Sequence, residues 1–129
     1  MSNRIDDGRE GRYGRASSFE IHAGWNVQLK LFYADDYAVL LLNGEKMLDI
    51  SFGEEEKLEV DLLNVLKQGE NTLQVQGWNY QPPVWSFRYR IGIFDAQGKP
   101  AFAAIDLTPK GTTPHHGVQY NVIYTFNKT

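Results

Sequence analysis

The amino-acid sequence predicts an all-β protein, an antiparallel β-sandwich of two sheets with about eight strands. Three observations support this fold class. Apolar and polar residues alternate over several stretches, turn-forming residues separate these stretches, and a helical pattern occurs only near residues 61–67, where it predicts at most one short helical turn. Short alternating strands joined by turns are typical of two antiparallel sheets packed face to face.

The composition is that of a folded chain of 129 residues without cysteine. Hydrophobic residues make up 42% and aromatic residues 13%, so the chain is able to bury a core. The absence of cysteine excludes disulfides, thiolate metal sites and cysteine nucleophiles. The formal net charge of −3, without a basic stripe among the aromatic residues, argues against a nucleic-acid partner.

Residues 1–17 differ from the rest of the sequence. They combine arginines, acids and glycines without apolar periodicity, so we expect a flexible or irregular N-terminal arm followed by one β-sandwich domain over residues 18–129. The longest apolar run, Ala38 to Leu42, is too short to insert into a membrane. The first residues lack a signal-peptide pattern, so the default expectation is a cytoplasmic protein.

The first strands follow the arm. Residues from Phe19 to Leu31 are apolar at every second position, which predicts a half-buried strand. Tyr37 to Leu42 is a nearly continuous apolar run and predicts a strand covered on both faces. The dipeptide Asn43-Gly44 predicts a type I′ hairpin, because both central positions of that turn need a positive φ, and the return strand is expected at 46–52.

The second half of the chain continues the pattern of short strands. A ten-residue loop is expected at 108–117, between the last two strands. The remaining strands are predicted at residues 57–62, 72–78, 85–94, 101–107 and 118–126.

The middle of the sequence carries a series of short motifs, which we call the recurrent phrase. It consists of an acidic pair, a strand that ends in Asn-Gly, a short "DL…L" segment, and Gly-Glu-Asn before a strand that ends near an Asn. The residues of the phrase are Asp35, Asp36, Asn43, Gly44, Asp61, Leu62, Leu66, Gly69, Glu70, Asn71 and Asn79. Over residues 25–95 the chain resembles the galactose-binding-like jelly-roll domains, which occur as sugar-binding modules of glycoside hydrolases and as lectin-like proteins. The resemblance implies a jelly-roll sandwich and a carbohydrate ligand.

The segment "GWNYQPPVWSFRYR", residues 77–90, has the composition of a sugar site. A pyranose needs an aromatic ring against its C–H face and polar groups around its hydroxyl rim. Alternation places Trp85 with the apolar set of its strand and Trp78 on the polar face of the preceding strand. We therefore expect Trp78 or Tyr80 to stack on the sugar. The residues expected to bond its hydroxyls are Asn79, Gln81, Asp36 and Arg88.

The adjacent acids Asp35 and Asp36 have two interpretations. One is a turn in which a carboxylate accepts backbone N–H groups. The other is a ligand role, either to a sugar hydroxyl or to calcium, which takes about six to eight oxygens and would need Asp6 and Asp7 from the arm as well. The sequence favours the turn, so no metal site and no cofactor are predicted, and calcium stays the one alternative. The pair His115-His116 is expected to be solvated.

Catalytic motifs are absent from the sequence: it has no Ser-His-Asp order, phosphate loop or HExxH motif. We therefore expect a non-catalytic, lectin-like carbohydrate-binding module, and a homo-oligomer because a single shallow sugar site is weak. The alternative is a structural or protein-interaction subunit without a small ligand, in which the arm pairs with the acidic segment 49–61 of another copy. Burial of both Trp78 and Tyr80 would favour this alternative.

Overall fold

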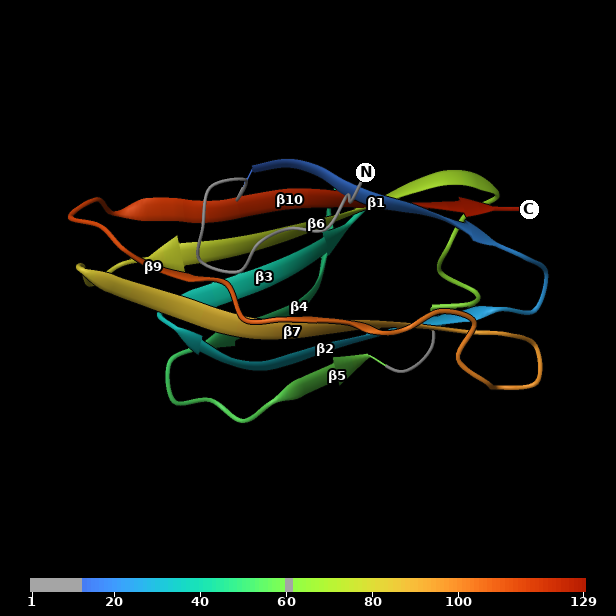
Figure 1. Ribbon diagram of the computed structural model, residues 1–129, viewed down its shortest axis with the longest axis horizontal. Coiled ribbons are helices and arrows are strands. Elements are labelled where there is room, and N and C mark those ends of the chain that lie inside the picture. Colours follow the sequence, from blue (N-terminus) through green and yellow to red (C-terminus); the bar gives the residue numbers. More distant parts are fainter. Residues whose placement is uncertain (1–12, 60–61) are drawn as a thin grey trace.

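The computed structural model describes residues 13–59 and 62–129, and within them ten strands form two sheets without any helix. The sheets pack face to face as a sandwich, so the predicted fold class is confirmed, with ten strands instead of about eight (Figure 1). In these ranges no helix has the length and apolar character needed to cross a membrane.

The first sheet has β1 and β4 at its edges and β6 at its centre. Its neighbours pair in antiparallel fashion except for β1, which runs parallel to β10. In spatial order the strands are β1 (Tyr13–Ile21), β10 (Gly117–Lys128), β6 (Gly69–Asn79), β3 (Tyr37–Leu42) and β4 (Glu45–Ser51).

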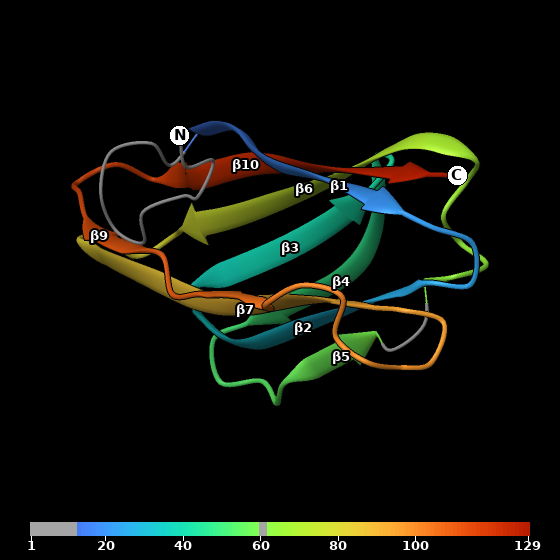
Figure 2. The same ribbon diagram turned by 45° about the vertical axis from the view of Figure 1, so that its right-hand side comes forward.

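The second sheet is built on the long pair β2 and β7. The short strands β8 and β9 both pair with β7, at different positions along it. β5 pairs with β2 (Figure 2). The strands are β5 (Lys57–Glu59), β2 (Asn26–Asp35), β7 (Val84–Phe94), β8 (Ile105–Leu107) and β9 (Lys110–Thr112).

Two local predictions are confirmed. Asn43 and Gly44 have φ values of 51° and 84°, as a type I′ hairpin requires. The helical pattern is a single turn, in which the N–H groups of Val65 and Leu66 donate to the carbonyl of Leu62 at 3.0 Å each. Leu62 and Leu66 are both buried, so this turn closes one end of the core.

The alternating stretch from Phe19 to Leu31 is not one strand but two, and these strands belong to different sheets. A turn with Gly24 at φ 83° separates β1 from β2. The prediction was wrong because odd-numbered residues face the same core on both sides of the turn. Ile21 and Val27 are both fully buried, so the period of two continues across the boundary.

The N-terminal boundary also differs from the prediction. β1 begins at Tyr13, so residues 13–17 of the expected arm are part of a strand, while residues 1–12 lie outside the described residues. The Tyr13 hydroxyl donates to the carbonyl of Val118 at 3.0 Å, and the strand pairs with β10. This partner is more than one hundred residues away along the chain, so the local pattern did not reveal it.

The region between β7 and β10 was predicted incorrectly in two places. Of the strand expected at 101–107, only the last three residues form a strand, β8. The loop expected at 108–117 contains the strand β9. Both strands have three residues and lie against one edge of β7. Strands this short carry too few residues to show a period of two.

The core between the sheets is rich in aromatic side chains. Trp85 is 1% exposed, which confirms its predicted place in the core. Phe87 packs directly on Gly77 of the opposite sheet, so closely that an added Cβ would overlap the Phe87 ring. Gly77 therefore admits an aromatic ring that any larger residue would displace.

Three buried tyrosine hydroxyls join the two sheets. Tyr89 on β7 lies 2.8 Å from the hydroxyl of Tyr120 and 2.7 Å from that of Tyr124, both on β10. Burial, followed by the neighbouring tyrosines, raises the pKa of Tyr89 well above its ordinary value, and burial raises the pKa of Tyr124 to about 12. The hydroxyls of Tyr89 and Tyr124 are therefore neutral at physiological pH, and Tyr89 bonds to both of its neighbours.

We expect Tyr89→Phe to lower the free energy of unfolding by about 1–3 kcal/mol, because it removes one hydrogen-bond partner from each of two buried hydroxyls. Urea denaturation followed by tryptophan fluorescence measures this change. The matched control is Tyr80→Phe, which removes an exposed hydroxyl and should change stability by less than about 0.5 kcal/mol. Equal effects of the two variants would contradict a structural role for the hydroxyl cluster.

Candidate functional site

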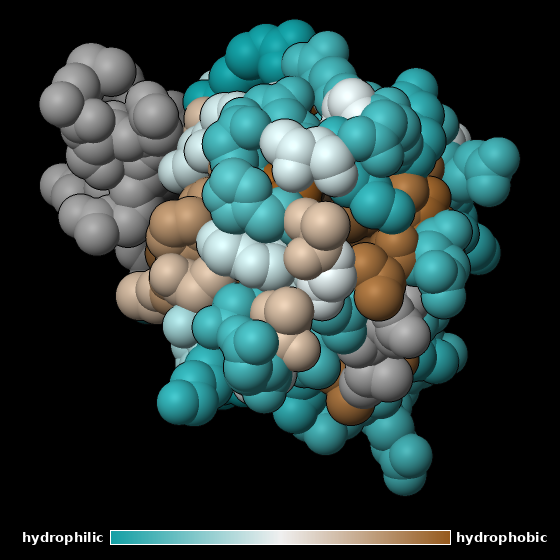
Figure 3. Space-filling view, turned by 90° about the vertical axis from the view of Figure 1, so that its right-hand side faces the viewer, coloured by the Kyte–Doolittle hydropathy of each residue, from teal (hydrophilic) through white to brown (hydrophobic). Residues whose placement is uncertain are grey.

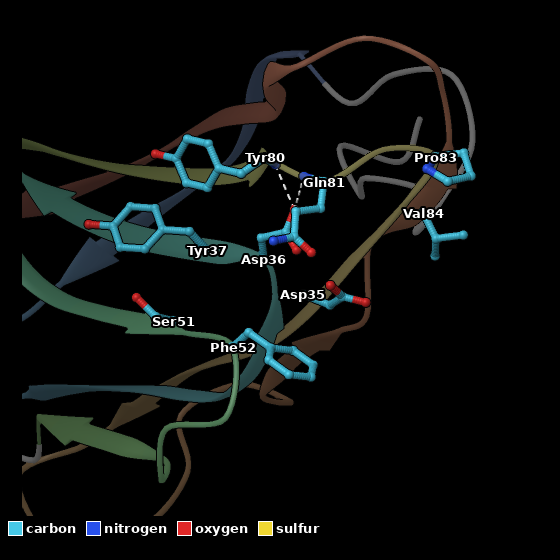
Figure 4. A pocket seen from close by; sticks show the side chains of 9 residues that line it. All are labelled: Asp35, Asp36, Tyr37, Ser51, Phe52, Tyr80, Gln81, Pro83 and Val84. Atoms are coloured by element: carbon cyan, nitrogen blue, oxygen red, sulfur yellow. Dashed lines mark hydrogen bonds between the residues drawn. The ribbon is translucent and has the colours of Figure 1, made fainter.

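A pocket of about 520 Å³ opens at the end of the sandwich where β2 leads into β3 and β6 leads into β7. Strand pairing brings its parts together, since Tyr37 lies opposite Ser51 on β4 and opposite Trp78 on β6, and Asp35 lies opposite Ser86 on β7. We call it the loop pocket (Figure 4). It is lined by Asp35, Asp36, Tyr37, Ser51, Phe52, Tyr80, Gln81, Pro83 and Val84.

The chain crosses between the two sheets twice beside this pocket. β2 of the second sheet ends at Asp35 and β3 of the first sheet begins at Tyr37. β6 of the first sheet ends at Asn79 and β7 of the second sheet begins at Val84. The crossings at residue 36 and residues 80–83 therefore lie next to each other.

Asp36 connects the two crossings. Its Oδ2 accepts hydrogen bonds from the backbone N–H groups of Tyr80, at 2.6 Å, and of Gln81, at 2.7 Å. Its carbonyl accepts from the N–H of Phe52 at 2.9 Å, and its own N–H donates to the carbonyl of Trp78 at 3.4 Å. Asp36 is thus a structural residue that accepts backbone N–H groups, as the turn interpretation expected, although the donors belong to the other crossing.

Asp35 and Asp36 differ in their acidity. Burial acts to raise the pKa of Asp36, but the hydrogen bonds from the backbone of Gln81 and Tyr80 outweigh it, and the pKa is lowered. The pKa of Asp35 is raised, first by burial and then by the hydrogen bond and charge of Asp36. Asp36 therefore retains the negative charge of the pair, and Asp35 takes up a proton more readily.

Aromatic rings flank these acids. Tyr80 is 51% exposed, and its ring lies 6.3 Å from the ring of Tyr37 and 5.8 Å from that of Trp78, on which it stacks at 23°. Figure 4 shows Tyr37 and Tyr80 to the left of Asp36 and the ring of Phe52, which is 74% exposed, below it. The pocket thus combines apolar ring surfaces with hydrogen-bonding groups.

Tyr37 is held in place from the neighbouring strand. Its hydroxyl donates to Oδ2 of Asp49 at 2.9 Å, and Lys46 approaches the same oxygen at 3.4 Å. Burial, and then the hydrogen bond to Asp49, raises the pKa of Tyr37 to about 12. The hydroxyl is therefore neutral, and the ring has a fixed orientation at the pocket wall.

Three of the predicted ligand residues, Asp36, Tyr80 and Gln81, line the loop pocket. Trp78 lies behind Tyr80 and supports it by stacking. The burial of both Trp78 and Tyr80 that would have removed the sugar site does not occur, since Tyr80 is exposed.

Asn79 does not fit its predicted role as a ligand residue. It is 0% exposed, and its amide donates to the carbonyl of His115 at 3.1 Å. The reason is the phase of the strand: Asn79 shares the inward-facing set of β6 with Leu73 and Val75. Its amide instead ties the start of the loop to the segment before β10.

Arg88 does not line the loop pocket either. It lies on the outer face of the second sheet, where its Nε and Nη2 each donate to Asp106 at 2.9 Å. The sequence placed Arg88 near the loop by its position in the chain. The strand carries it away from the sheet crossings, because β7 already begins at Val84.

Several pocket residues were not predicted as ligand residues. Ser51 and Phe52 come from the end of β4, Pro83 and Val84 from the start of β7, and Tyr37 from the start of β3. They reach the pocket through long-range strand register, which local periodicity does not contain. One feature of the sequence could have pointed to this part of the pocket. Phe52 is an apolar residue in a polar turn directly after a strand, and it is exposed.

The described residues contain no group of three or more His, Asp or Glu side chains that could hold a metal ion. Asp6 and Asp7, which the calcium alternative required, lie outside the described residues. His115 and His116 are exposed in the segment before β10.

We expect Asp36→Ala to lower the free energy of unfolding by about 1.5–3 kcal/mol, since it removes charge-assisted hydrogen bonds to two backbone N–H groups. The matched control is Asp35→Ala, one residue away in the same pocket, which should change stability by less than about 0.5 kcal/mol. Chemical denaturation at pH 7 measures both. A larger loss in the Asp35 variant would contradict the assignment of the structural role to Asp36.

The acidity of Asp36 predicts the pH dependence of its contribution. Because its folded pKa lies below the ordinary value of 3.8, its stabilisation is present above pH 3.8 and is lost as the pH falls through the folded pKa. The stability difference between the wild type and Asp36→Asn should therefore shrink on acidification below that pH. Denaturation curves recorded at steps from pH 7 to pH 2.5 test this, and a difference that grows on acidification would contradict it.

Comparison with known proteins adds no family assignment. No protein-family model matches the chain, and no curated protein and no solved structure matches it. Two sheets packed as a sandwich and the loop pocket between their crossings are therefore the basis for a function.

Proposed function

We propose that this protein is a non-catalytic carbohydrate-binding module of lectin type, with the loop pocket as its sugar site. The observation that supports this most is the exposed ring of Tyr80 beside hydrogen-bonding groups in a pocket of about 520 Å³. A sugar ring has an apolar face and a polar rim, and this combination of surfaces complements both.

Each part of the pocket has a role in the proposal. Tyr80 stacks on the sugar, and Phe52 covers its far side. The Asp35 carboxyl, the Ser51 hydroxyl and the side-chain amide of Gln81 line the same space and bond the sugar hydroxyls. Asp36 is a positioning residue in this scheme, because its Oδ2 already accepts two backbone hydrogen bonds.

The two carboxyl groups support binding more than hydrolysis. Glycosidases place two carboxyl groups on opposite sides of the bond that they cleave, at least about 5 Å apart. Here the acids of the pocket are adjacent residues, and one of them is occupied by the loop backbone. A binding role needs only one of them to face the ligand.

We also propose the galactose-binding-like jelly-roll family as the origin of the domain. The residues of the recurrent phrase have structural roles that suit a fold signature. Asn71 is fully buried, and its side chain bonds the backbone of Lys67, Gly69 and Phe126. It also accepts from the side-chain amide of Asn43 at the hairpin, so the phrase connects the hairpin with the helical turn.

Assembly into a homo-oligomer is part of the same proposal. The loop pocket is open, and a single open sugar site binds weakly. Several copies that present their pockets together gain avidity without new contacts to each sugar.

The second candidate is a protein-interaction module without a small ligand. The observation that favours it is the 74% exposure of Phe52, with the 51% exposure of Val84 on the same pocket rim. Exposed apolar side chains of this kind also suit a protein partner.

A glycan array probed with the labelled wild type, with and without calcium, tests the proposed function. We expect binding to a set of neutral glycans, and a loss of at least about tenfold for Tyr80→Ala because the stacking ring is gone. The matched control is Tyr33→Ala, an exposed tyrosine at 41% that does not line the pocket, and it should bind like the wild type.

Two results would reject the carbohydrate proposal. One is that no glycan binds in either condition, which would favour the protein-interaction candidate. The other is equal glycan binding by Tyr80→Ala and the wild type, which would place any sugar site away from the loop pocket. Thermal denaturation of both variants verifies that they are folded.

A further inference from the structure

A second cavity, of about 310 Å³, lies on the outer face of the second sheet, away from the core. Strands β2 and β7 form its floor, and the edge strands β5 and β8 with the residues before β8 form its sides. We call it the sheet groove. It is lined by Gln28, Leu29, Lys30, Leu58, Arg90, Gly92, Phe94, Ala104 and Asp106.

One row of side chains crosses the whole sheet in this groove. Strand register pairs Leu58 with Lys30, Lys30 with Arg90, and Arg90 with Asp106. Paired residues of neighbouring strands point to the same face, so the row presents an apolar, two basic and one acidic group side by side.

The next row contains a recess. It pairs Gln28 with Gly92, and the ring of Phe94 lies across the glycine, where an added Cβ would come within 2.8 Å of the ring. A larger residue than glycine would raise this ring from the sheet. The floor beside the charged row is therefore an aromatic ring, and Leu58, 55% exposed, stands at its rim.

Three cations gather over Phe32, at the other side of the charged row. The Arg88 guanidinium carbon lies 3.8 Å from the ring centroid, the Lys30 Nζ 4.6 Å and the Arg90 guanidinium carbon 5.1 Å. Asp106 accepts hydrogen bonds from both arginines, and Glu56 pairs with Lys30 at 3.3 Å. Three cations thus face two carboxylates, which leaves one positive charge in excess.

We propose that the sheet groove binds an acidic sugar, a uronic acid residue, with its carboxylate between Lys30 and Arg90 and its ring over Phe94. One excess positive charge matches the single carboxylate of one uronic acid ring, so in an oligosaccharide one ring occupies the groove and the other rings lie outside it. A doubly charged phosphate would leave a negative charge unmatched. Gln28 supplies a side-chain amide for the hydroxyls of the sugar, and the Phe94 ring covers its C–H face. Asp106 is a positioning residue, because its two oxygens already accept hydrogen bonds from Arg88 and Arg90.

This inference goes beyond the loop pocket and uses none of its residues. The loop pocket carries the acids Asp35 and Asp36, which repel a carboxylate, whereas the sheet groove carries Lys30 and Arg90. The two sites therefore separate sugars by charge, neutral ones at the end of the sandwich and acidic ones on its face. Arg88, which the sequence singled out as a ligand residue, helps to hold Asp106 in this second site.

Isothermal titration calorimetry of the full chain with trigalacturonate tests the inference. We expect binding that weakens as salt rises, and a loss of at least about tenfold for the fully methyl-esterified trisaccharide, which keeps the sugar rings but lacks the charges. Arg90→Gln and Lys30→Gln should each weaken binding of the acid by about tenfold or more. The matched control is Lys110→Gln, which removes a cation of the same sheet outside the groove and should change the affinity by less than about twofold.

Three outcomes would overturn the inference: no binding of trigalacturonate by the wild type, equal binding of its methyl ester, or unchanged binding by both Arg90→Gln and Lys30→Gln. The use of two variants on different strands covers the case in which one of them fails to fold, as thermal denaturation reveals. Tyr80→Ala should leave trigalacturonate binding unchanged, and Arg90→Gln should leave neutral glycan binding unchanged. Failure of one site is thus distinguishable from failure of the other.

Discussion

The carboxylate of Asp36 accepts hydrogen bonds from the backbone of Tyr80 and Gln81, and so it connects the two places where the chain passes between the sheets. Apart from this link, the loop at 80–83 is attached through its flanking strands and through the N–H of Thr113, which donates to the carbonyl of Pro83 at 2.7 Å. With the link from Asp36, the exposed ring of Tyr80 and the amide of Gln81 are fixed relative to Tyr37 and Ser51. Because the pKa of Asp36 is lowered from its ordinary value of 3.8, its carboxylate is ionised and keeps this link at neutral pH.

The rest of the sandwich provides the rigidity that this end needs. The hydroxyl of Tyr89 bonds Tyr120 and Tyr124 across the core, and Phe87 fits against Gly77, so the two sheets are fixed relative to each other. Binding groups on loops are effective when a rigid scaffold positions them. The same rigid sheets present different chemistry in two places, acidic and aromatic at the loop pocket, basic and aromatic in the sheet groove.

Local periodicity accounts for the parts of the fold that the sequence predicts correctly. The hairpin at Asn43-Gly44, the core position of Trp85 and the single turn at 62–66 all depend on neighbouring residues. The turn between β1 and β2 was missed because alternation continues in phase across it, and β8 and β9 were misplaced because each has three residues.

The candidate site likewise contains residues that the local sequence predicts and residues that it does not. Asp36, Tyr80 and Gln81 were found because they lie in or beside one polar and aromatic loop. Asn79 and Arg88 were misassigned since nearness in the chain is not nearness in space: one side chain points into the core and the other lies on a sheet face. The partner of Asp36, by contrast, is forty-four residues away in the chain and no local signal reveals it.

The most direct test of the account is to map a bound neutral glycan onto the protein by nuclear magnetic resonance. The strongest neutral glycan of the array is titrated into ¹⁵N-labelled protein, and the shifts of the backbone amide signals are recorded. Because the N–H groups of Tyr80 and Gln81 bond Asp36 in the proposed sugar site, we expect the largest shifts at these two residues and at Ser51 and Phe52. Shifts confined to other surfaces, or none at saturating glycan, would contradict the assignment of the loop pocket as the sugar site.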